Sequence, residues 1–464
     1  MTTLSKQNEL SELGELAPTW ELRLRELVNE LDVPGAVVGV SLHGERVTFA
    51  AGIESLRSGH PVLPETAFQI GSISKVYTAT LLALLGGLDE QMLERPVAEL
   101  VPEAEWIDRA VEVRHLLTHS SALPGDCFSD TGRGDDALAR YVRELSLLPN
   151  DHPGRPGERY SYCNSGYAIL GRLVEVLSGT SYETALRQRL LDPLGVRSTS
   201  ALPEETLLWP HAAGHNRFPG RPLVADDLWN FSRAATALGG ISASAADVLS
   251  FAELHLNGGL TADGSRLLAT AVVEAMLSHQ LQAPPLSRPA ARGLGWCIYD
   301  TPQGEIFGHD GETLGQCAKL RLVPKLGLAL VVLANGIPDG GLITGGLERL
   351  IFGHWGLVAE PLSLKPPATF DPSPYLGRYR NQQGVIEVTP SGQGLSLNQL
   401  TEAEGLWSEE YRTELLAIGG DAFVEADDER PLSAERFGDR DAAGRCQSFY
   451  NGRLYWRLSE ESQL

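Results

Sequence analysis

Residues 71–85 read GSISKVYTATLLALL, and the prediction of the fold and of the chemistry begins from this stretch. Beyond its first turn the stretch is apolar and rich in Ala, Leu and Thr, which predicts a buried helix that ends at Gly86 and Gly87. Ser72 and Lys75 are three residues apart at the start of that helix, so their side chains share one face. An amine next to a hydroxyl can accept its proton, and an ammonium can stabilise its alkoxide. We therefore predict that Ser72 is a nucleophile and that Lys75 activates it.

The sequence YSYCN at residues 160–164 precedes a second predicted helix, residues 165–177. A tyrosine that lies close to a lysine and a serine can act as a general base, because the positive charge lowers its pKa. Tyr162 is the candidate for this role. Asn164 can donate a hydrogen bond to a substrate carbonyl or hold Lys75, although an asparagine at this place is also typical of a helix cap.

A third motif, GHDG at residues 308–311, lies at the end of a predicted strand. Its two glycines allow a backbone to approach a ligand closely. A single histidine, here His309, is more often structural than catalytic. This motif therefore indicates a site only together with the other two.

The pattern along the chain predicts an α+β fold. An amphipathic helix at residues 19–31 leads into a hairpin of strands at 36–42 and 46–51. Helices then dominate the middle of the chain, and strands return at residues 292–299, 305–309, 318–324 and 326–334. We expect the early and the late strands to form one antiparallel sheet that closes around the helical block.

A change of composition divides the chain. Residues 360–374, EPLSLKPPATFDPSP, contain five prolines and cannot lie inside a helix or a sheet. After them, short alternating runs broken by Gly, Asn and Asp predict a small all-β sheet or barrel. The predicted organisation is a domain over residues 1–360, a linker over 361–374 and an all-β domain over 375–464.

In chain order the three motifs are SxxK, YxN and HxG, and together they resemble the motifs of the penicillin-recognising serine hydrolases. The resemblance is to the branch that holds class C β-lactamases and related esterases and D-aminopeptidases. It extends over roughly residues 20–360 through further matching segments, which are FQI at 68–70, RHLLTHSS at 114–121, PGE at 156–158, SGY at 165–167 and GGISASAAD at 239–247. The resemblance implies a domain with an antiparallel sheet and a helical block.

The resemblance also implies the roles of the motif residues. Ser72 attacks a carbonyl, and Lys75 and Tyr162 pass its proton to the leaving group. Asn164 orients the substrate. No metal or organic cofactor is implied.

The third motif departs from the pattern of the β-lactamases. His309 stands where many members of the family carry Lys, which helps to hold the carboxylate of a β-lactam. A histidine supplies less fixed charge. The backbone N–H groups of Ser72 and Glu312, the latter just after Gly311, are implied as the oxyanion hole.

Two further regions hold candidate substrate contacts. Residues 375–464 resemble the lipocalin-like barrel that is appended to some of these hydrolases, where it either stabilises the protein or covers the active site. On this barrel, Arg445, Arg453 and Arg457 are candidates to meet a substrate carboxylate. In the polar loop at residues 124–142, Asp130 and Arg133 are candidates to recognise a charged substrate, and the alternative is a solvated loop that caps a helix.

Composition limits the partners. The net charge of −22 argues against nucleic acid and anionic membranes, because both would be repelled. Residues 1–17 are polar and acidic and lack the apolar segment of a signal peptide, so we expect a cytoplasmic protein.

The leading hypothesis is a serine hydrolase or acyltransferase that forms an acyl-enzyme on Ser72 with an ester, thioester or peptide-like substrate, free or bound to a carrier. One alternative is a penicillin-binding-protein-type thioesterase that releases and macrocyclises a nonribosomal peptide. A β-lactamase is a second alternative. A non-catalytic binding protein is the alternative from a different class.

Overall fold

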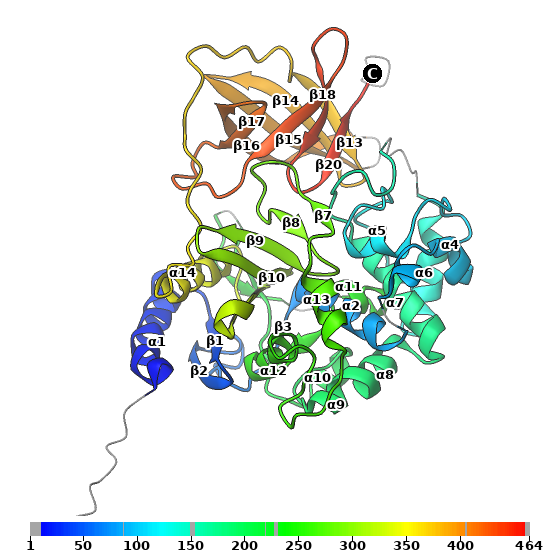
Figure 1. Ribbon diagram of the computed structural model, residues 1–464. Helices are drawn as coiled ribbons and strands as arrows, with labels where there is room; N and C mark the ends of the chain where they lie inside the picture. Colours follow the sequence, from blue (N-terminus) through cyan, green and yellow to red (C-terminus); the bar gives the residue numbers. More distant parts are fainter. Residues whose placement is uncertain are drawn as a thin grey trace, which may run out of the picture.

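The computed structural model describes residues 11–86, 88–148, 154–218, 220–226, 231–403 and 406–459. Gly87, the second residue of the predicted helix stop, lies outside these ranges. The chain forms a larger domain of sheet and helices and a smaller barrel that sits on top of it (Figure 1). The predicted α+β class with a C-terminal all-β part is confirmed.

An eight-stranded antiparallel sheet forms the centre of the larger domain, in the order β2-β1-β12-β11-β10-β9-β8-β7. Early and late strands of the domain are neighbours in this sheet, since β1 pairs with β12 from Ala36 opposite Ala334 to Leu42 opposite Leu328. The strands are β1 (Gly35–Leu42), β2 (Glu45–Gly52), β7 (Leu281–Gln282), β8 (Ala291–Arg292), β9 (Cys297–Thr301), β10 (Gly304–Thr313), β11 (Gln316–Val323) and β12 (Leu328–Ala334).

The two faces of this sheet are covered by different helices. Alternate residues of β12 point to opposite faces, so that Leu330 packs toward α1 and α14 while Val331 packs toward the helical block. Helices α1 and α14 lie side by side along one face (Figure 1). Their bounds are α1 (Glu12–Glu30) and α14 (Gly340–Gly353).

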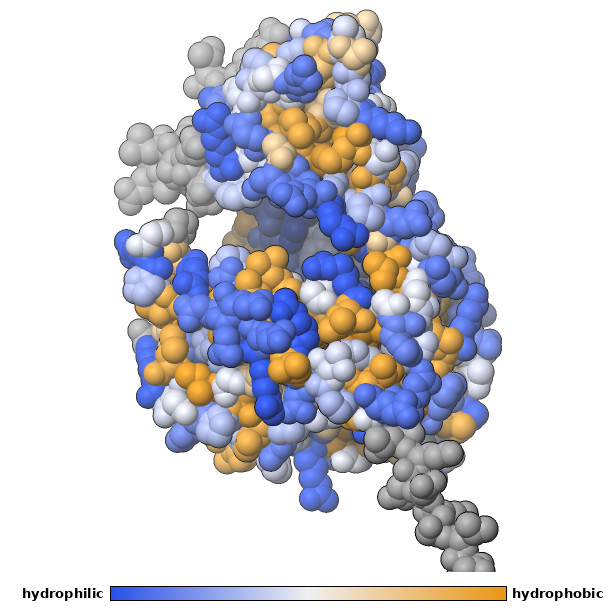
Figure 2. All heavy atoms as spheres, turned by 90° about the vertical axis from the view of Figure 1, so that its left-hand side faces the viewer, coloured by the Kyte–Doolittle hydropathy of each residue, from blue (hydrophilic) through white to orange (hydrophobic). Residues whose placement is uncertain are grey.

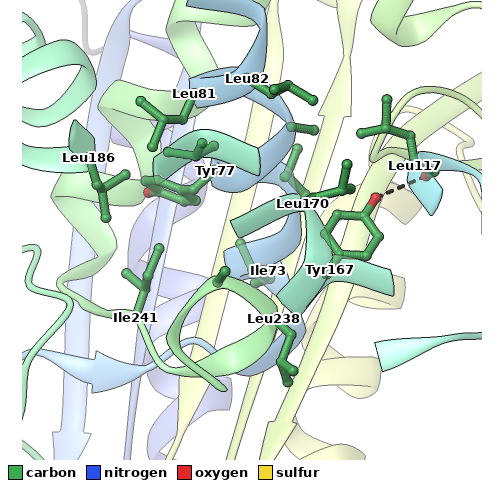
Figure 3. Close-up of a cluster of buried hydrophobic side chains, with 14 of the residues drawn as sticks. Ile73, Tyr77, Leu81, Leu82, Leu117, Tyr167, Leu170, Leu186, Leu238 and Ile241 are labelled. Atoms are coloured by element: carbon green, nitrogen blue, oxygen red, sulfur yellow. Dashed lines mark hydrogen bonds between the residues drawn. The ribbon is translucent and has the colours of Figure 1, made fainter. Parts of the chain in front are cut away.

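The helical block lies on the other face, and its centre is α2 packed against α7 and α11. Figure 3 shows the apolar side chains of this core, among them Ile73, Tyr77 and Leu170. The Tyr167 hydroxyl donates a hydrogen bond of 2.9 Å to the Leu117 carbonyl at the edge of the cluster (Figure 3). The main helices are α2 (Ser74–Leu84), α5 (Val113–Leu117), α6 (Ala137–Leu145), α7 (Asn164–Ser178), α8 (Tyr182–Leu186), α11 (Thr236–Gly239), α12 (Ala245–Leu256) and α13 (Thr270–Leu277).

Short elements complete the larger domain. They are β3 (Phe68–Gln69), η1 (Gly71–Ile73), α3 (Glu90–Leu93), α4 (Val97–Leu100), η2 (Pro102–Ala104), η3 (Arg187–Leu191), α9 (Asp192–Leu194), α10 (Pro203–Thr206), β4 (His215–Asn216), β5 (Val224–Ala225), η4 (Arg233–Ala235), β6 (Ser242–Ala243) and η5 (Pro324–Leu326). Strand β3 pairs with β6 directly before η1, which carries Ser72. This pairing fixes the entry of the chain into the catalytic turn.

Two predicted elements have different bounds in the structure. The first helix begins at Glu12 and not near residue 19, because the Ser11 side chain caps it and Leu13 extends its buried face. The predicted strand at residues 292–299 is split into β8 and β9. The chain turns at Gly295, where φ is +86° and where a Cβ would lie 2.6 Å from the Ala79 Cβ of α2.

The C-terminal strands form a closed antiparallel barrel in sequence order, with β13 pairing back to β20. Its interior is filled by aromatic and aliphatic side chains, including Tyr379, Phe423, Phe437 and Phe449. The strands are β13 (Gly377–Asn381), β14 (Gly384–Ser391), β15 (Gly394–Ala403), β16 (Leu406–Gly419), β17 (Ala422–Glu425), β18 (Glu435–Arg440), β19 (Cys446–Tyr450) and β20 (Leu454–Arg457). Within the part of the chain that the structure describes, no helix combines the length and the apolar character needed to cross a bilayer.

The burial of the central sheet predicts its sensitivity to truncation. Leu330 of β12 is 0% exposed, so Leu330→Ala should lower the free energy of unfolding by about 2–5 kcal/mol through lost burial and a residual cavity. Leu22→Ala in α1 is the control, because Leu22 is 59% exposed and its truncation should change stability by less than about 0.5 kcal/mol. Chemical denaturation followed by tryptophan fluorescence measures both, and equal effects would contradict this assignment of the core.

Candidate active site

Ser72 and Lys75 lie in direct contact at the junction of η1 and α2. The Lys75 Nζ atom is 3.0 Å from the Ser72 Oγ atom, and it also donates a hydrogen bond of 2.6 Å to the Leu238 carbonyl of α11. Ser72 lies on the short 3-10 helix η1, which directly precedes α2. The sequence had predicted it in the first turn of the long helix itself. The i, i+3 spacing still brings the two side chains together, because both turns are right-handed and continuous.

Lys75 is 0% exposed, and this burial changes its chemistry. Removal from water disfavours the ammonium form and lowers the pKa of Lys75 to about 7, and the charge of Asp126 only partly opposes this shift. A substantial fraction of the amine is then neutral near pH 7. Neutral Lys75 can accept the Ser72 proton directly across the 3.0 Å contact.

Tyr162 lies over the same pair, with the Lys75 Nζ atom 5.0 Å from its ring centroid. Burial raises the pKa of Tyr162 above its ordinary value, and a hydrogen bond with Ser72 opposes the rise. The expectation that the nearby lysine lowers the pKa of Tyr162 is therefore wrong, because desolvation of the phenolate outweighs the positive charge. Tyr162 remains a phenol at neutral pH, and it suits the transfer of a proton between Lys75, Ser72 and a leaving group.

His119 positions Tyr162, a role that was not predicted from the sequence. The His119 ring stacks on the Tyr162 ring with centroids 4.3 Å apart and planes at 25°. Its Nδ1 atom accepts a hydrogen bond of 3.0 Å from the Cys163 N–H, and its backbone is in the left-handed region with φ of +58°. Burial holds the pKa of His119 well below its usual range, so the ring supports Tyr162 as a neutral group.

His309 is on β10 and faces Tyr162, with ring centroids 6.2 Å apart. Its Nδ1–H donates to the Asp310 carbonyl at 2.6 Å, and its Nε2 atom is buried without a partner among the described residues. Burial, together with the charges of Arg292 and Lys75, lowers the pKa of His309 to about 3. His309 is therefore neutral, and its Nε2 atom keeps a lone pair that can accept a hydrogen bond.

Two glycines bring the backbone of β10 against the catalytic turn. A Cβ on Gly311 would lie 1.9 Å from the Ile70 carbonyl oxygen and 3.2 Å from the Ser72 nitrogen. A Cβ on Gly71 would lie 2.6 Å from the Glu312 nitrogen. Any side chain at either glycine would separate the two segments. The close approach places the amides of Ser72 and Glu312 side by side, as an oxyanion hole requires.

Asn164 is connected to the barrel through an aspartate. Its Nδ2 atom donates to the Asp126 carboxylate, which is in turn bound by Arg453 through Nε at 2.5 Å and through a second nitrogen at 3.1 Å. Of the three arginines proposed on the barrel, Arg453 is the one that reaches this region, and its guanidinium lies 5.2 Å from the Tyr162 ring centroid. Asp126 belongs to the polar loop at residues 124–142 in which substrate contacts were predicted.

Arg292 is a second residue that the sequence did not indicate. It is 5% exposed on β8, and its guanidinium lies 4.5 Å from the Tyr160 ring centroid and 5.9 Å from that of Tyr162. It donates to the Tyr160 hydroxyl and to the Cys297 sulfur, while its Nε atom has no partner among the described residues. Arg292 thus supplies the permanent positive charge that the neutral His309 lacks.

A cavity of about 940 Å³ lies between the sheet domain and the barrel, and its described lining includes Tyr162 and His309 but not Ser72. Tyr162, Arg292 and His309 line its floor, and residues from β17 to β18 and from the β19–β20 turn line its roof. The space-filling view shows the molecule hollowed where the barrel meets the larger domain, with hydrophilic side chains around the hollow (Figure 2).

Three predicted substrate contacts lie elsewhere. Asp130 is exposed and accepts the Gly132 N–H in a local turn, and Arg133 is exposed and forms an ion pair of 2.8 Å with Glu204. Arg445 forms an ion pair of 3.0 Å with Asp441 in the turn before β19. None of the three is among the described residues that line the cavity. Arg457 is also structural, because it donates to carbonyls inside the barrel wall.

A buried amine beside a serine hydroxyl, a phenol near both and two closely packed backbone segments form an arrangement suited to a serine hydrolase. Comparison with known proteins agrees. The family model described as Beta-lactamase matches residues 20–343. The chain belongs to this β-lactamase family of serine hydrolases.

Individual relatives each cover about three quarters of the chain or more. A penicillin-binding protein 4 of Amycolatopsis lactamdurans is 38% identical over 379 residues, which are 79% of this chain and 98% of the relative. An unguisins hydrolase of Aspergillus campestris is 25% identical over 75% of this chain and 66% of its own length. Among solved structures, SurE superposes with a TM-score of 0.76 and 29% identity over 96% of this chain and all of its own, so the likeness includes the barrel.

The lowered pKa of Lys75 predicts the pH dependence of acylation. The second-order rate constant for reaction of Ser72 with a fluorophosphonate should rise as the pH increases through about 7 and level off above it, because Lys75 must lose its proton to act as a base. The measurement is the labelling rate from pH 5.5 to pH 9. Lys75→Arg is the control, since a guanidinium keeps its proton and should abolish the rise. A wild-type rate constant that is equal at pH 5.5 and pH 8.5 would rule out Lys75 as the base.

Proposed function

We propose that this protein forms an acyl-enzyme on Ser72 with a peptide-like ester, thioester or amide and then transfers the acyl group to water or to an amine. The observation that carries the proposal is the 3.0 Å contact between Ser72 Oγ and a Lys75 amine whose pKa is about 7. Lys75 takes the proton as Ser72 attacks the carbonyl. The amides of Ser72 and Glu312 stabilise the oxyanion, and each such donor is worth about 3 kcal/mol of barrier.

Proton transfer to the leaving group is assigned to Tyr162. Its phenol keeps its proton at neutral pH, so it can donate to a departing amine, alcohol or thiol and then be reprotonated by Lys75. In the second half-reaction the same groups act in reverse on the incoming acceptor. The unpartnered Nε2 atom of the neutral His309 can accept a hydrogen bond from an incoming amine, while Lys75 takes the proton.

Release of a peptide by intramolecular aminolysis is the second candidate. The cavity is roofed by the barrel and, at about 940 Å³, is large enough to fold a peptide back on its own acyl carbon. SurE, which matches the chain including its barrel, has also been solved with D-Leu. A penicillin-binding-protein-type thioesterase that macrocyclises a peptide accounts for both the roof and the absence of a lysine at His309.

Efficient β-lactam hydrolysis is less well supported by the site. The neutral His309 leaves no fixed charge at the position where β-lactamases hold the carboxylate of their substrate. Arg292 is the nearest substitute, but its ring contacts hold it against Tyr160. We therefore assign the protein to acyl chains of a peptide-like kind rather than to β-lactams.

The first test asks whether Ser72 reacts at all. The wild-type protein should give a stoichiometric adduct with a fluorophosphonate, seen as a mass increase of the intact protein, and Ser72→Ala should give none. Ser74→Ala is the matched control, because Ser74 lies on the same turn but its hydroxyl accepts the Ile241 N–H and takes no part in acylation. A folded wild-type protein without an adduct would identify a non-catalytic binding protein.

The second test separates the two acceptors. A linear peptidyl N-acetylcysteamine thioester with a free amino terminus is supplied, and the products are resolved by mass. Cyclic peptide, lighter than the linear acid by one water, is expected if aminolysis dominates. Linear acid alone, across peptides of different length and with either D or L residues at the acyl end, would reject the cyclase and leave the hydrolase.

A further inference from the structure

The roof of the cavity has a chemical character that the reaction at Ser72 does not use. Along β17, the following loop and the start of β18, the lining residues include four carboxylates and one arginine. The carboxylates are Glu425, Asp428, Glu429 and Glu435, and the arginine is Arg430. Carboxyl groups therefore outnumber cationic groups along this stretch of the roof.

Two of these carboxylates point into the barrel at the end that opens on the cavity. Glu435 pairs with Phe423 across β17 and β18, and Glu425 pairs with Leu415 across β16 and β17. Phe423, Leu415 and Phe437 belong to the apolar core of the barrel. Paired residues share a face, so Glu425 and Glu435 also face inward, as the last layer above the aromatic side chains.

Glu435 lacks the partner that a buried carboxylate requires. Its Oε2 atom is fully buried and has no hydrogen-bond partner, and no described cation forms an ion pair with it. Burial and the neighbouring charge of Glu425 raise the pKa of Glu435 to about 8. Without a cation beside it Glu435 is therefore mostly protonated at neutral pH, and a bound cation would favour its carboxylate form.

Arg453, another arginine that lines the cavity, is already neutralised by an ion pair. Arg453 lies on the same rim of the barrel, but both oxygens of the Asp126 carboxylate accept hydrogen bonds from it. It therefore does not compensate Glu435. Glu435, Tyr162 and His309 line the same cavity. A single extended substrate can therefore contact all three side chains.

We propose that the mouth of the barrel is a cation-binding subsite, in which Glu435, with Glu425 at the rim, binds an ammonium or guanidinium group of the substrate while the acyl carbon lies at Ser72. This inference rests on the proposed function, because it names a chemical feature of the acyl chain. The cationic group belongs to a side chain remote from the scissile bond, as the opposite ends of the cavity require. The choice of substrate then depends on the charge of the side chain that reaches Glu435 and on the acyl group that reacts at Ser72.

Turnover of matched substrates tests the subsite. Peptidyl N-acetylcysteamine thioesters are prepared in which each residue in turn is lysine or its neutral analogue norleucine. For at least one position, the wild-type protein should show a kcat/KM for lysine at least about tenfold above that for norleucine, the scale of a charge-assisted hydrogen bond. Glu435→Gln should bring that ratio close to one. No preference at any position, or a ratio that Glu435→Gln leaves unchanged, would overturn the proposal.

A matched variant separates direct contact from the general field of the roof. Glu429→Gln removes the same charge from the same loop, but Glu429 is exposed, so the lysine-to-norleucine ratio should stay within about twofold of the wild type. Equal losses in Glu429→Gln and Glu435→Gln would replace the subsite by long-range attraction. Glu425→Gln should give an intermediate loss, because Glu425 lies at the exposed rim.

Binding to a protein that cannot turn over keeps the inference separate from the proposed function. In Ser72→Ala, calorimetry with the corresponding peptide amides should show the lysine peptide binding at least about tenfold more tightly, and the double variant Ser72→Ala/Glu435→Gln should lose this difference. If no acyl-enzyme forms in the wild type but this difference appears, the function is wrong and the subsite stands. If acylation proceeds and the difference is absent, the subsite is wrong.

Discussion

The burial of one amine is the constraint on which the site depends. Lys75 is completely removed from water, and among the described residues its amine has one hydroxyl and one main-chain carbonyl at hydrogen-bond distance. A cation in such a place is unfavourable, so the structure favours the neutral base that the reaction needs. The charges of Arg292 and Arg453 act in the same direction, and that of Asp126 acts against it. Reactivity here is a result of packing and not of one strong ion pair.

The rest of the larger domain holds the backbone that surrounds this amine. Helix α2 supplies Lys75, α11 supplies the carbonyl of Leu238, and β10 crosses the catalytic turn at Gly311. These segments come from the early, middle and late parts of the chain. In the antiparallel sheet, too, early and late parts of the chain are joined, because β1 pairs with β12. The precision of the site therefore depends on long-range pairing.

The sequence predicted what short spacing and strong periodicity can determine. The three motifs, the antiparallel sheet and the C-terminal barrel are present, and α7 lies within one residue of the bounds predicted for it at each end. Strand β18 was not predicted, because its alternate residues include the charged Glu435 and Asp439 and therefore do not form an apolar pattern. The roles of Arg292 and His119 could not be predicted from the sequence either. Their partners are Tyr160 and Tyr162, and no local pattern indicates a contact over 130 residues or a ring stacked beneath a phenol.

The barrel has a consequence for how such proteins diversify. The Tyr162 N–H donates to the Gly452 carbonyl in the β19–β20 turn, and Arg453 beside it holds the aspartate that binds Asn164. The barrel is thus hydrogen-bonded directly to the backbone of Tyr162, the proposed proton donor. Recombination that exchanged whole barrels between homologues would replace this turn together with the roof. New specificities should then arise more readily by loop grafts that spare residues 450–453 than by shuffling intact modules.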